Sequence, residues 1–317
     1  MNIEIILNPN SGHGNSIIYA KKIKDLLLKN SCNEVNIFES LSIESTEQRF
    51  KEIKEKDIQL DLIILMGGDG TVSICIDRML KTGLNFPIAI FPSGTVNDFS
   101  KQLGMTKNVK KFVKTILANS KKQCDLAISN GIYTINVASG GYFTHGANTY
   151  SSKAKKLFGK IVYYVKGMFS AFGMSPQRLK ITADDNTYEE EVLIYLIANS
   201  KSVGGFKKMG ARAKIDDGYF DLCMIKDGGI SLIFTFFKLF FGLHTNDKNV
   251  IYKKAKNFKV ELVPNMHEDR ITKRKHLKKT NPKFISRDID GNKGPHLPLN
   301  VQVIENKITV YYSNKKA

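Results

Sequence analysis

The chain has no tryptophan, and its 317 residues include only eight prolines and four cysteines. The cysteines, Cys32, Cys75, Cys124 and Cys223, are widely separated and form no CxxC pair, so we interpret them as reduced thiols rather than as a disulfide framework. The six histidines show no HExxH or other metal-ligand spacing. A zinc site and a histidine-based catalytic triad are therefore unsupported.

Long apolar runs are also lacking. The run from Ile230 to Leu243 is interrupted by Lys238 and falls short of the roughly 20 residues that a transmembrane helix needs. We interpret it as a core or substrate-pocket helix. Residues 157–172 carry apolar side chains at helical spacing behind several lysines, which is typical of an interfacial helix or of a helix that covers a sheet. No signal peptide precedes the first strand, so we expect a cytoplasmic protein.

Negative charge is scarce relative to positive charge. The chain has 48 Lys and Arg against 30 Asp and Glu, a net charge of +18, which favours an anionic partner such as nucleic acid, a lipid surface or phosphate. No nucleic-acid module or aromatic-rich basic motif is present, so we expect no nucleic-acid partner. Peripheral association with the anionic inner face of the cell membrane fits the charge better. The basic segment 265–288 is either a solvated loop or such a contact.

The order of strand and helix patterns predicts two domains. From residue 1 to 125 the two alternate, which indicates a doubly wound parallel sheet. Strands are expected at 3–7, 35–38, 61–66 and 87–91, and helices at 15–30, 45–56, 72–82 and 106–120. Residues 126–317 are mostly strand-like, which predicts a mainly antiparallel β-sandwich domain. Its expected strands are 134–138, 179–182, 192–197, 219–225, 258–263, 301–304 and 307–312.

Three glycine-bearing loops, Asn8–Gly12, Gly67–Thr71 and Pro92–Asp98, directly follow apolar strands in the first domain. Loops at the carboxyl ends of parallel strands bind phosphate through backbone N–H groups and helix N-termini. The carboxylate of Asp69 does not favour a bare phosphate, so it indicates a cation or a proton to be removed; a magnesium nucleotide meets both needs. Three ordinary tight turns are the other interpretation.

These motifs, Asn-Pro-x-Ser-Gly at residue 8, Gly-Gly-Asp-Gly-Thr at 67 and Gly-Thr-Val-Asn-Asp-Phe at 94, resemble the catalytic domain of the diacylglycerol kinase superfamily. The second half agrees, with Asp-Asp-Gly-Tyr-Phe at 216, and His-Thr at 244 followed by Val-Ile-Tyr-Lys-Lys-Ala-Lys at 250. The pattern is similar to the soluble diacylglycerol kinases of Gram-positive bacteria. The resemblance covers nearly the whole chain.

The resemblance implies an ATP-dependent lipid kinase that uses Mg²⁺ and phosphorylates a hydroxyl of diacylglycerol or a related lipid. Asp69 would position the metal and phosphates or act as the base. The nucleotide-binding positions that it implies are Asn8, Pro9, Asn10, Ser11, Gly12, Gly68, Asp69, Gly70, Thr71, Val72, Ser73, Ile74 and Thr95.

Further sites follow from the same resemblance. Asp98 and Asp125 match acidic positions that extend a water and metal network towards the second domain; a turn cap and a surface carboxylate are the other interpretations. Lys214, Asp217 and Tyr219 match a structural magnesium site, where hairpin-turn chemistry is the alternative. Similar enzymes also suggest that the tail, residues 306–317, returns to the first domain and that the protein is a homodimer.

The chain departs from the family at one catalytic position. The family's Asp-Gly-Glu, whose glutamate is the proposed base, reads Asp290-Gly291-Asn292 here, and a neutral Asn292 cannot accept a proton. Asp69 or Asp290 could substitute, or the chain could be a pseudokinase that binds nucleotide and membrane without turnover. A third hypothesis is an NAD-kinase-like enzyme, because Gly-Gly-Asp-Gly-Thr also occurs there. The Gly-Thr-Val-Asn-Asp-Phe motif and the second-domain matches argue against it.

Overall fold

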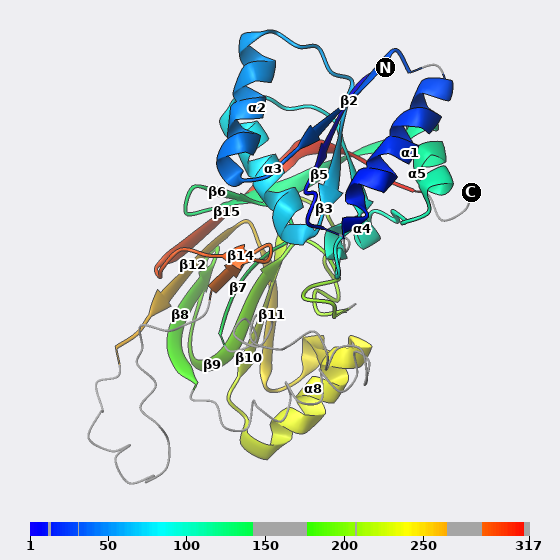
Figure 1. Cartoon of the computed structure of the whole chain (residues 1–317). Helices are drawn as coiled ribbons and strands as arrows, with labels where there is room; N and C mark the ends of the chain where they lie inside the picture. Colours follow the sequence, from blue (N-terminus) through cyan, green and yellow to red (C-terminus); the bar gives the residue numbers. More distant parts are fainter. Residues whose placement is uncertain (12–13, 31, 142–175, 207, 265–286, 314–317) are drawn as a thin grey trace.

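The structure is a computed structural model that describes residues 1–11, 14–30, 32–141, 176–206, 208–264 and 287–313. Figure 1 shows an upper part in which helices flank a sheet and a lower part built mainly of strands. The predicted fold class, an α/β nucleotide domain followed by a mainly antiparallel β domain, is confirmed.

The first domain is a parallel sheet covered on both faces. Its strands are β1 (Asn2–Leu7), β2 (Glu34–Glu39), β3 (Leu62–Gly67) and β4 (Ile88–Pro92), in the spatial order β2, β1, β3, β4. Its helices are α1 (Ser16–Lys29), α2 (Ile43–Glu55), α3 (Asp69–Lys81), α4 (Asp98–Gln102) and α5 (Val109–Leu117). α1 and α5 lie on one face and α2 and α3 on the other (Figure 1). Because both faces are covered, β3 and β4 are buried along their whole length.

The second domain consists of antiparallel strands. They are β5 (Lys121–Ser129), β6 (Ile132–Thr134), β7 (Val137–Gly141), β8 (Gln177–Ala183), β9 (Asn186–Ala198), β10 (Phe220–Lys226), β11 (Val250–Ala255), β12 (Asn257–Leu262), β13 (Arg287–Ile289), β14 (Asn292–Lys293) and β15 (Leu299–Tyr311). β9 is central, because it pairs with β7, β8 and β10. Helix α8 (Leu232–Phe241) lies beyond these strands, flanked by the short 3₁₀ turns η2 (Gly229–Ser231) and η3 (His244–Asn246).

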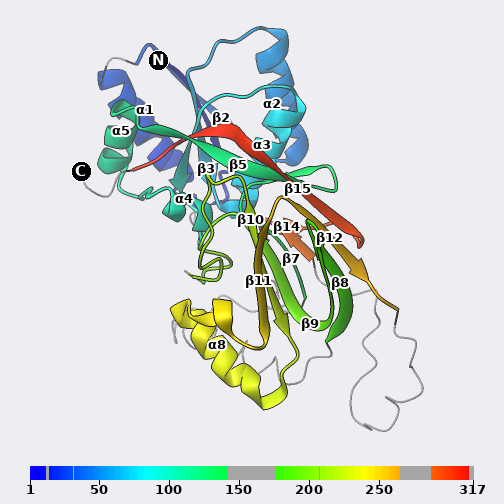
Figure 2. The same cartoon turned by 180° about the vertical axis from the view of Figure 1, so that it is seen from behind.

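The last strand, β15, joins the two sheets. Its first residues pair with β12 of the second domain, most of its length from Val301 to Tyr311 pairs with β5, and Val310 near its end pairs in parallel with Ile88 of β4 (Figure 2). The sequence pattern predicted two strands here, at 301–304 and 307–312. The structure has one strand with a register shift between Ile304 and Ile308, which marks the place where it passes from one domain to the other.

Three differences from the sequence prediction bear on function. α3 begins at Asp69 rather than at residue 72, so Asp69 belongs to the first turn of a helix. The strand expected at 134–138 is two strands, and the break between them leaves the N–H groups of Ile135 and Asn136 outside a sheet ladder. The run interpreted from sequence as a core or substrate-pocket helix, α8, buries only one of its faces.

Candidate functional site

The second and third glycine loops pack directly against each other at the carboxyl edge of the sheet. The Gly94 N–H donates to the carbonyl of Gly67 at 3.2 Å, and a Cβ on Gly94 would lie 2.4 Å from the Cα of Gly68. Only a residue without a side chain fits at position 94. Gly68 is also the N-cap of α3, and no side chain caps this helix end. Its first N–H groups are therefore available to an anionic ligand.

The first glycine loop is attached to the other two by side chains. The Ser11 hydroxyl lies 2.9 Å from that of Ser93 after β4, and the Asn8 amide donates to the Thr71 hydroxyl in α3 at 3.4 Å. Asn10 folds back within the same loop, with its N–H donating to Asn8 Oδ1 at 2.9 Å. All three loops therefore line one edge of the sheet.

The other predicted nucleotide-binding positions differ in how they could reach a ligand. Thr95 is exposed, whereas the side chains of Val72 and Ser73 are buried, so these two can offer a ligand only their backbone. Ile74 is half-buried on α3. Gly12 lies outside the described residues, as does the expected helix at 157–172.

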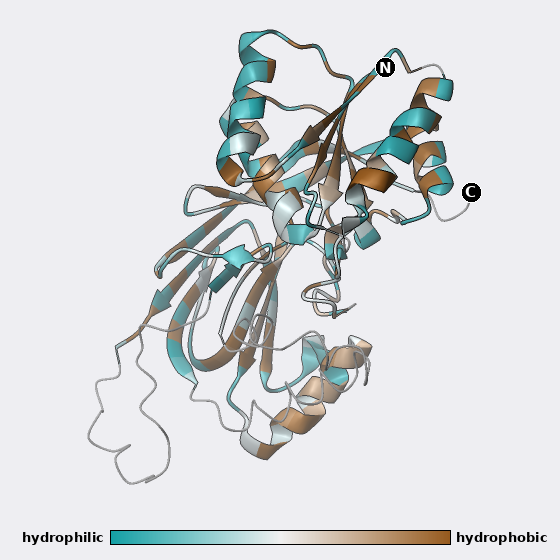
Figure 3. Cartoon of the chain, in the orientation of Figure 1, coloured by the Kyte–Doolittle hydropathy of each residue, from teal (hydrophilic) through white to brown (hydrophobic). Residues whose placement is uncertain are grey.

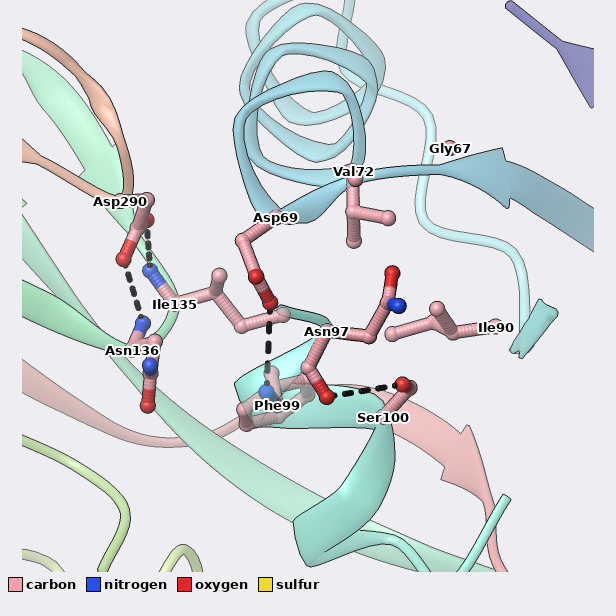
Figure 4. A pocket seen from close by; sticks show the side chains of 11 residues that line it. Gly67, Asp69, Val72, Ile90, Asn97, Phe99, Ser100, Ile135, Asn136 and Asp290 are labelled. Carbon is pink, nitrogen blue, oxygen red and sulfur yellow. Dashed lines mark hydrogen bonds between the residues drawn. The ribbon is translucent and has the colours of Figure 1, made fainter. Parts of the chain in front are cut away.

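Asp69 occupies the pocket at which the two domains meet (Figure 4). Its Oδ1 accepts one long hydrogen bond, 3.4 Å, from the N–H of Phe99. Burial, together with the nearby carboxylates of Asp98 and Asp290, raises the pKa of Asp69 to about 6. Among the described residues no lysine, arginine or histidine forms an ion pair with Asp69. This carboxylate therefore has unused capacity to bind a proton or a cation.

Asp290 differs from Asp69 because protein donors saturate it. Its carboxylate accepts from the N–H groups of Ile135, Asn136 and Val137 at 2.7 to 2.8 Å and from the Ser73 hydroxyl at 2.9 Å. Burial raises the pKa of Asp290 to about 6, opposed by these hydrogen bonds. Because both oxygens are engaged inside the protein, the geometry argues against Asp290 as a substitute base and makes it a connector between α3 and β7.

Asp98 also connects the domains. It is almost fully buried, and its carboxylate accepts from the Ser202 hydroxyl at 2.5 Å and from the Gly205 N–H at 2.8 Å. Both donors belong to the loop after β9 in the second domain. These bonds explain the burial of Asp98 better than a turn cap does. The predicted water and metal network stays a prediction.

Asp125 has the same kind of role on β5. It accepts from the Gly218 N–H at 2.7 Å and from the Asn306 N–H at 2.8 Å, and it is 1% exposed. The alternative of a surface carboxylate is therefore wrong for Asp125. Its hydrogen bonds hold the turn before β10 and the middle of β15 at the domain junction.

The predicted structural magnesium positions lie around this turn. The Lys254 ammonium pairs with one carboxylate oxygen of Asp217, and the Tyr219 N–H donates to the other at 3.3 Å. Lys214 is exposed. No cluster of three or more His, Cys, Asp or Glu side chains suited to a metal occurs in the described parts of the chain. The three residues stay a prediction that depends on backbone carbonyls as ligands.

Asn292 lies over the beginning of α3. Its side-chain amide donates to the carbonyl of Gly70 at 3.1 Å, and its Oδ1 is 3.0 Å from where a Cβ on Gly70 would be. The hairpin of β13 and β14 therefore places Asn292 against Gly70, which follows Asp69 in the chain. A neutral amide stands at the helix N-terminus, where a carboxylate would be favoured by the helix dipole.

Two polar residues of the site were not singled out from the sequence. Asn97 has a left-handed backbone, with φ 54°, and its side chain bonds both the N–H and the carbonyl of Gly94, which holds the third loop in place. Lys107 donates to the same carbonyl at 3.1 Å. Asparagine adopts the left-handed backbone more readily than most residues, so its position between Gly94 and the start of α4 could have indicated the role of Asn97 from the sequence. Lys107 gave no signal, because only the tertiary structure brings it to the loop.

Comparisons with known proteins agree with this architecture. Residues 2–128 match the family model of the diacylglycerol kinase catalytic domain, and residues 136–312 match the YegS C-terminal NAD kinase beta sandwich-like domain. The diacylglycerol kinase of Bacillus subtilis (strain 168) is 30% identical over 266 residues, which cover 83% of this chain and 86% of that protein. A diacylglycerol kinase of Staphylococcus epidermidis is 27% identical over 310 residues, covering 97% and 90%.

A crystal structure of a diacylglycerol kinase from Bacillus anthracis (strain Sterne) superposes on this chain with a TM-score of 0.75. The two are 25% identical, and the match covers 100% of this chain and 98% of the other. Fold and comparisons define a two-domain kinase architecture. The chain belongs to the diacylglycerol kinase family.

Proposed function

We propose that this protein is an ATP-dependent lipid kinase that transfers the γ-phosphoryl group to a hydroxyl of diacylglycerol or a related lipid. The observation that carries the proposal is the state of Asp69. It is a carboxylate without a cationic partner among the described residues, with a pKa raised to about 6, beside the open N-terminus of α3. A proton acceptor next to anion-binding N–H groups is what phosphoryl transfer to a hydroxyl requires.

The residues of the pocket suit a magnesium nucleotide. Of the three neighbouring carboxylates, Asp98 and Asp290 have both oxygens engaged by protein donors, which leaves Asp69 to bind a cation. One carboxylate together with substrate phosphates is the usual way in which proteins bind Mg²⁺. Mg²⁺ and ATP would supply the phosphoryl group and neutralise charge that develops during its transfer.

The protein's own residues would then act as follows. The first N–H groups of α3 bind the phosphates, and the Gly67–Gly94 contact keeps these groups clear of side chains. Asp69 would either hold the cation or accept the proton of the lipid hydroxyl, and its raised pKa suits it to the second role near neutral pH. Asn292 takes no part in this proton transfer; its side-chain amide donates to the Gly70 carbonyl and keeps the β13–β14 hairpin over the start of α3.

A second candidate is a pseudokinase that binds nucleotide and membrane without turnover. The specific observation in its favour is the neutral Asn292 at the place beside Gly70 where the resembling enzymes carry a glutamate. Loss of a general base typically lowers the rate by about 10²- to 10⁴-fold, which is compatible with either slow turnover or none.

The deciding experiment measures transfer of label from ATP, with Mg²⁺, to a panel of hydroxylated lipids in mixed micelles. Wild type, Asp69→Asn and Asn292→Glu are compared, with exposed Asp185→Asn as the matched control. We expect wild type and the control to be equally active and Asp69→Asn to lose about 10²-fold or more. Activity in Asn292→Glu alone would establish the pseudokinase. If none of the proteins labels any lipid, both the lipid-kinase proposal and the idea that Asn292 alone prevents turnover are rejected.

The same assay with NAD as acceptor tests the NAD-kinase-like alternative, for which we expect no product. A homodimer is proposed from the resemblance, and sedimentation of the purified protein measures it.

A further inference from the structure

Helix α8 has an exposed apolar face. Five of its large side chains or those next to it are between 45% and 79% exposed. We call this set the α8 patch; it consists of Ile230, Phe234, Phe237, Phe241 and Leu243. Single exposed apolar residues are common on proteins, but a contiguous group of this size marks an interaction surface.

The patch is not the helix's packing face. Leu232, Phe236 and Leu239 point the other way and pack into a buried cluster with β9, β10 and β11. Figure 3 shows α8 coloured as hydrophobic along most of its length. A helix that is apolar all round is normally buried on all sides. The outer half of α8 therefore needs a partner other than the strands beneath it.

The charges around the patch are mainly positive. No Asp or Glu occurs from residue 228 to 246, and the exposed Asp227 lies just before this segment. The next acid, Asp247, is 7% exposed and is bonded by Thr235 and Lys238. Two further cations bond only neutral oxygens here: Lys208 donates to the carbonyl of Phe241, and Arg212 donates to side-chain oxygens of η3. An apolar face bordered by more cations than anions complements an anionic lipid surface.

We propose that the α8 patch is the surface by which this protein docks on an anionic lipid bilayer, with its phenylalanines inserted among the headgroups. The inference rests on the proposed function insofar as that function places the acceptor in a membrane. A second copy of the chain fits less well, because an isologous contact would bring the same cations, Lys208 and Arg212, together.

The position of α8 agrees with this use. α8 lies at the end of the second domain that is farthest from the first domain, in both views (Figures 1 and 2). Docking through it would leave the glycine loops facing water, from which a nucleotide arrives. No helix in the described parts of the chain is long and apolar enough to cross a membrane, so the contact would be interfacial.

The test is co-sedimentation of the purified full-length protein with vesicles of phosphatidylcholine, alone or mixed with anionic phosphatidylglycerol. The variant Phe234→Ser with Phe237→Ser removes two side chains of 67% and 64% exposure. Ile18→Ser with Leu41→Ser removes two of 52% and 71% exposure from the first domain and is the matched control. Lys208→Gln tests the charge.

We expect the patch variant to lose at least about tenfold in vesicle partitioning, since two large apolar side chains would no longer leave water on binding. Lys208→Gln should lose only the extra binding given by phosphatidylglycerol. The control should bind as wild type does. Unchanged vesicle binding of the patch variant overturns the proposal. If its self-association falls instead, the partner is a second copy; if its midpoint of thermal unfolding falls, the patch is internal packing.

Phosphoryl transfer separates this proposal from the function on which it rests. With a short-chain diacylglycerol dispersed as monomers, the patch variant should match wild type, whereas with vesicle-borne diacylglycerol it should be slower by the same factor as its loss of binding. Vesicle binding that depends on the patch, without label in any lipid, would retain the docking surface and reject the kinase. Equal slowing with both forms of substrate would reject docking as the cause.

Discussion

Asp69→Asn is expected to inactivate the protein and to stabilise its fold at neutral pH. The reason is that the folded protein holds this carboxylate in a buried pocket near two others, which raises its pKa from 3.8 to about 6. Ionising Asp69 above pH 6 therefore costs folding free energy. An asparagine keeps the oxygen that accepts from Phe99 but carries no charge.

The sign and size follow from linkage. Because the pKa is raised on folding, the stability that neutral Asp69 contributes is fully present below about pH 4 and is lost as pH rises through about pH 6. A shift of this size corresponds to about 3 kcal/mol. Asp69 is partly exposed, so screening reduces the expected gain of Asp69→Asn at pH 8 to about 1–2 kcal/mol.

Urea unfolding of both proteins without nucleotide or metal measures this gain. The difference in unfolding free energy, variant minus wild type, should be about 1–2 kcal/mol at pH 8 and close to zero at about pH 3, below the pKa of the unfolded state. The exposed control, Asp185→Asn, should show no such trend. A difference that is the same at both pH values, or a destabilised variant at pH 8, would refute the idea that ionised Asp69 lacks an ion-pair partner and destabilises the fold.

Three further predictions concern the same pocket. In the kinase assay, kcat/KM should fall below about pH 6 as Asp69 becomes protonated, and a pH-independent rate from 5 to 8 would contradict its role as base. Gly94→Ala should abolish nucleotide binding and lower the unfolding free energy by about 1–3 kcal/mol, because the new Cβ would meet Gly68 Cα at 2.4 Å; calorimetry and urea unfolding measure both. Asp98→Ala should lower the unfolding free energy by about 2–4 kcal/mol by leaving the donors of Ser202 and Gly205 unpaired, whereas a loss below 0.5 kcal/mol would mean that the domains do not depend on it.

Local patterns determined the elements of this protein and the positions of its loops. The alternation of strands and helices predicted the parallel sheet, and the glycine loops after β1, β3 and β4 were recognised from their residues alone. This worked because buried parallel strands are continuous apolar runs and because the loops at their carboxyl ends necessarily share one edge of the sheet.

Contacts between distant residues were decided only by the tertiary structure. Asp290 and Ser73 are 217 positions apart, and nothing near either residue indicates that they bond or that Asp290 is saturated while Asp69 is free. The exposure of the α8 patch could not be predicted from the sequence either, because an apolar helix has the same residue pattern whether one of its faces or both are covered. Hydrophobic periodicity is a property of neighbouring residues, whereas pKa, burial and partner choice depend on what folding brings alongside them.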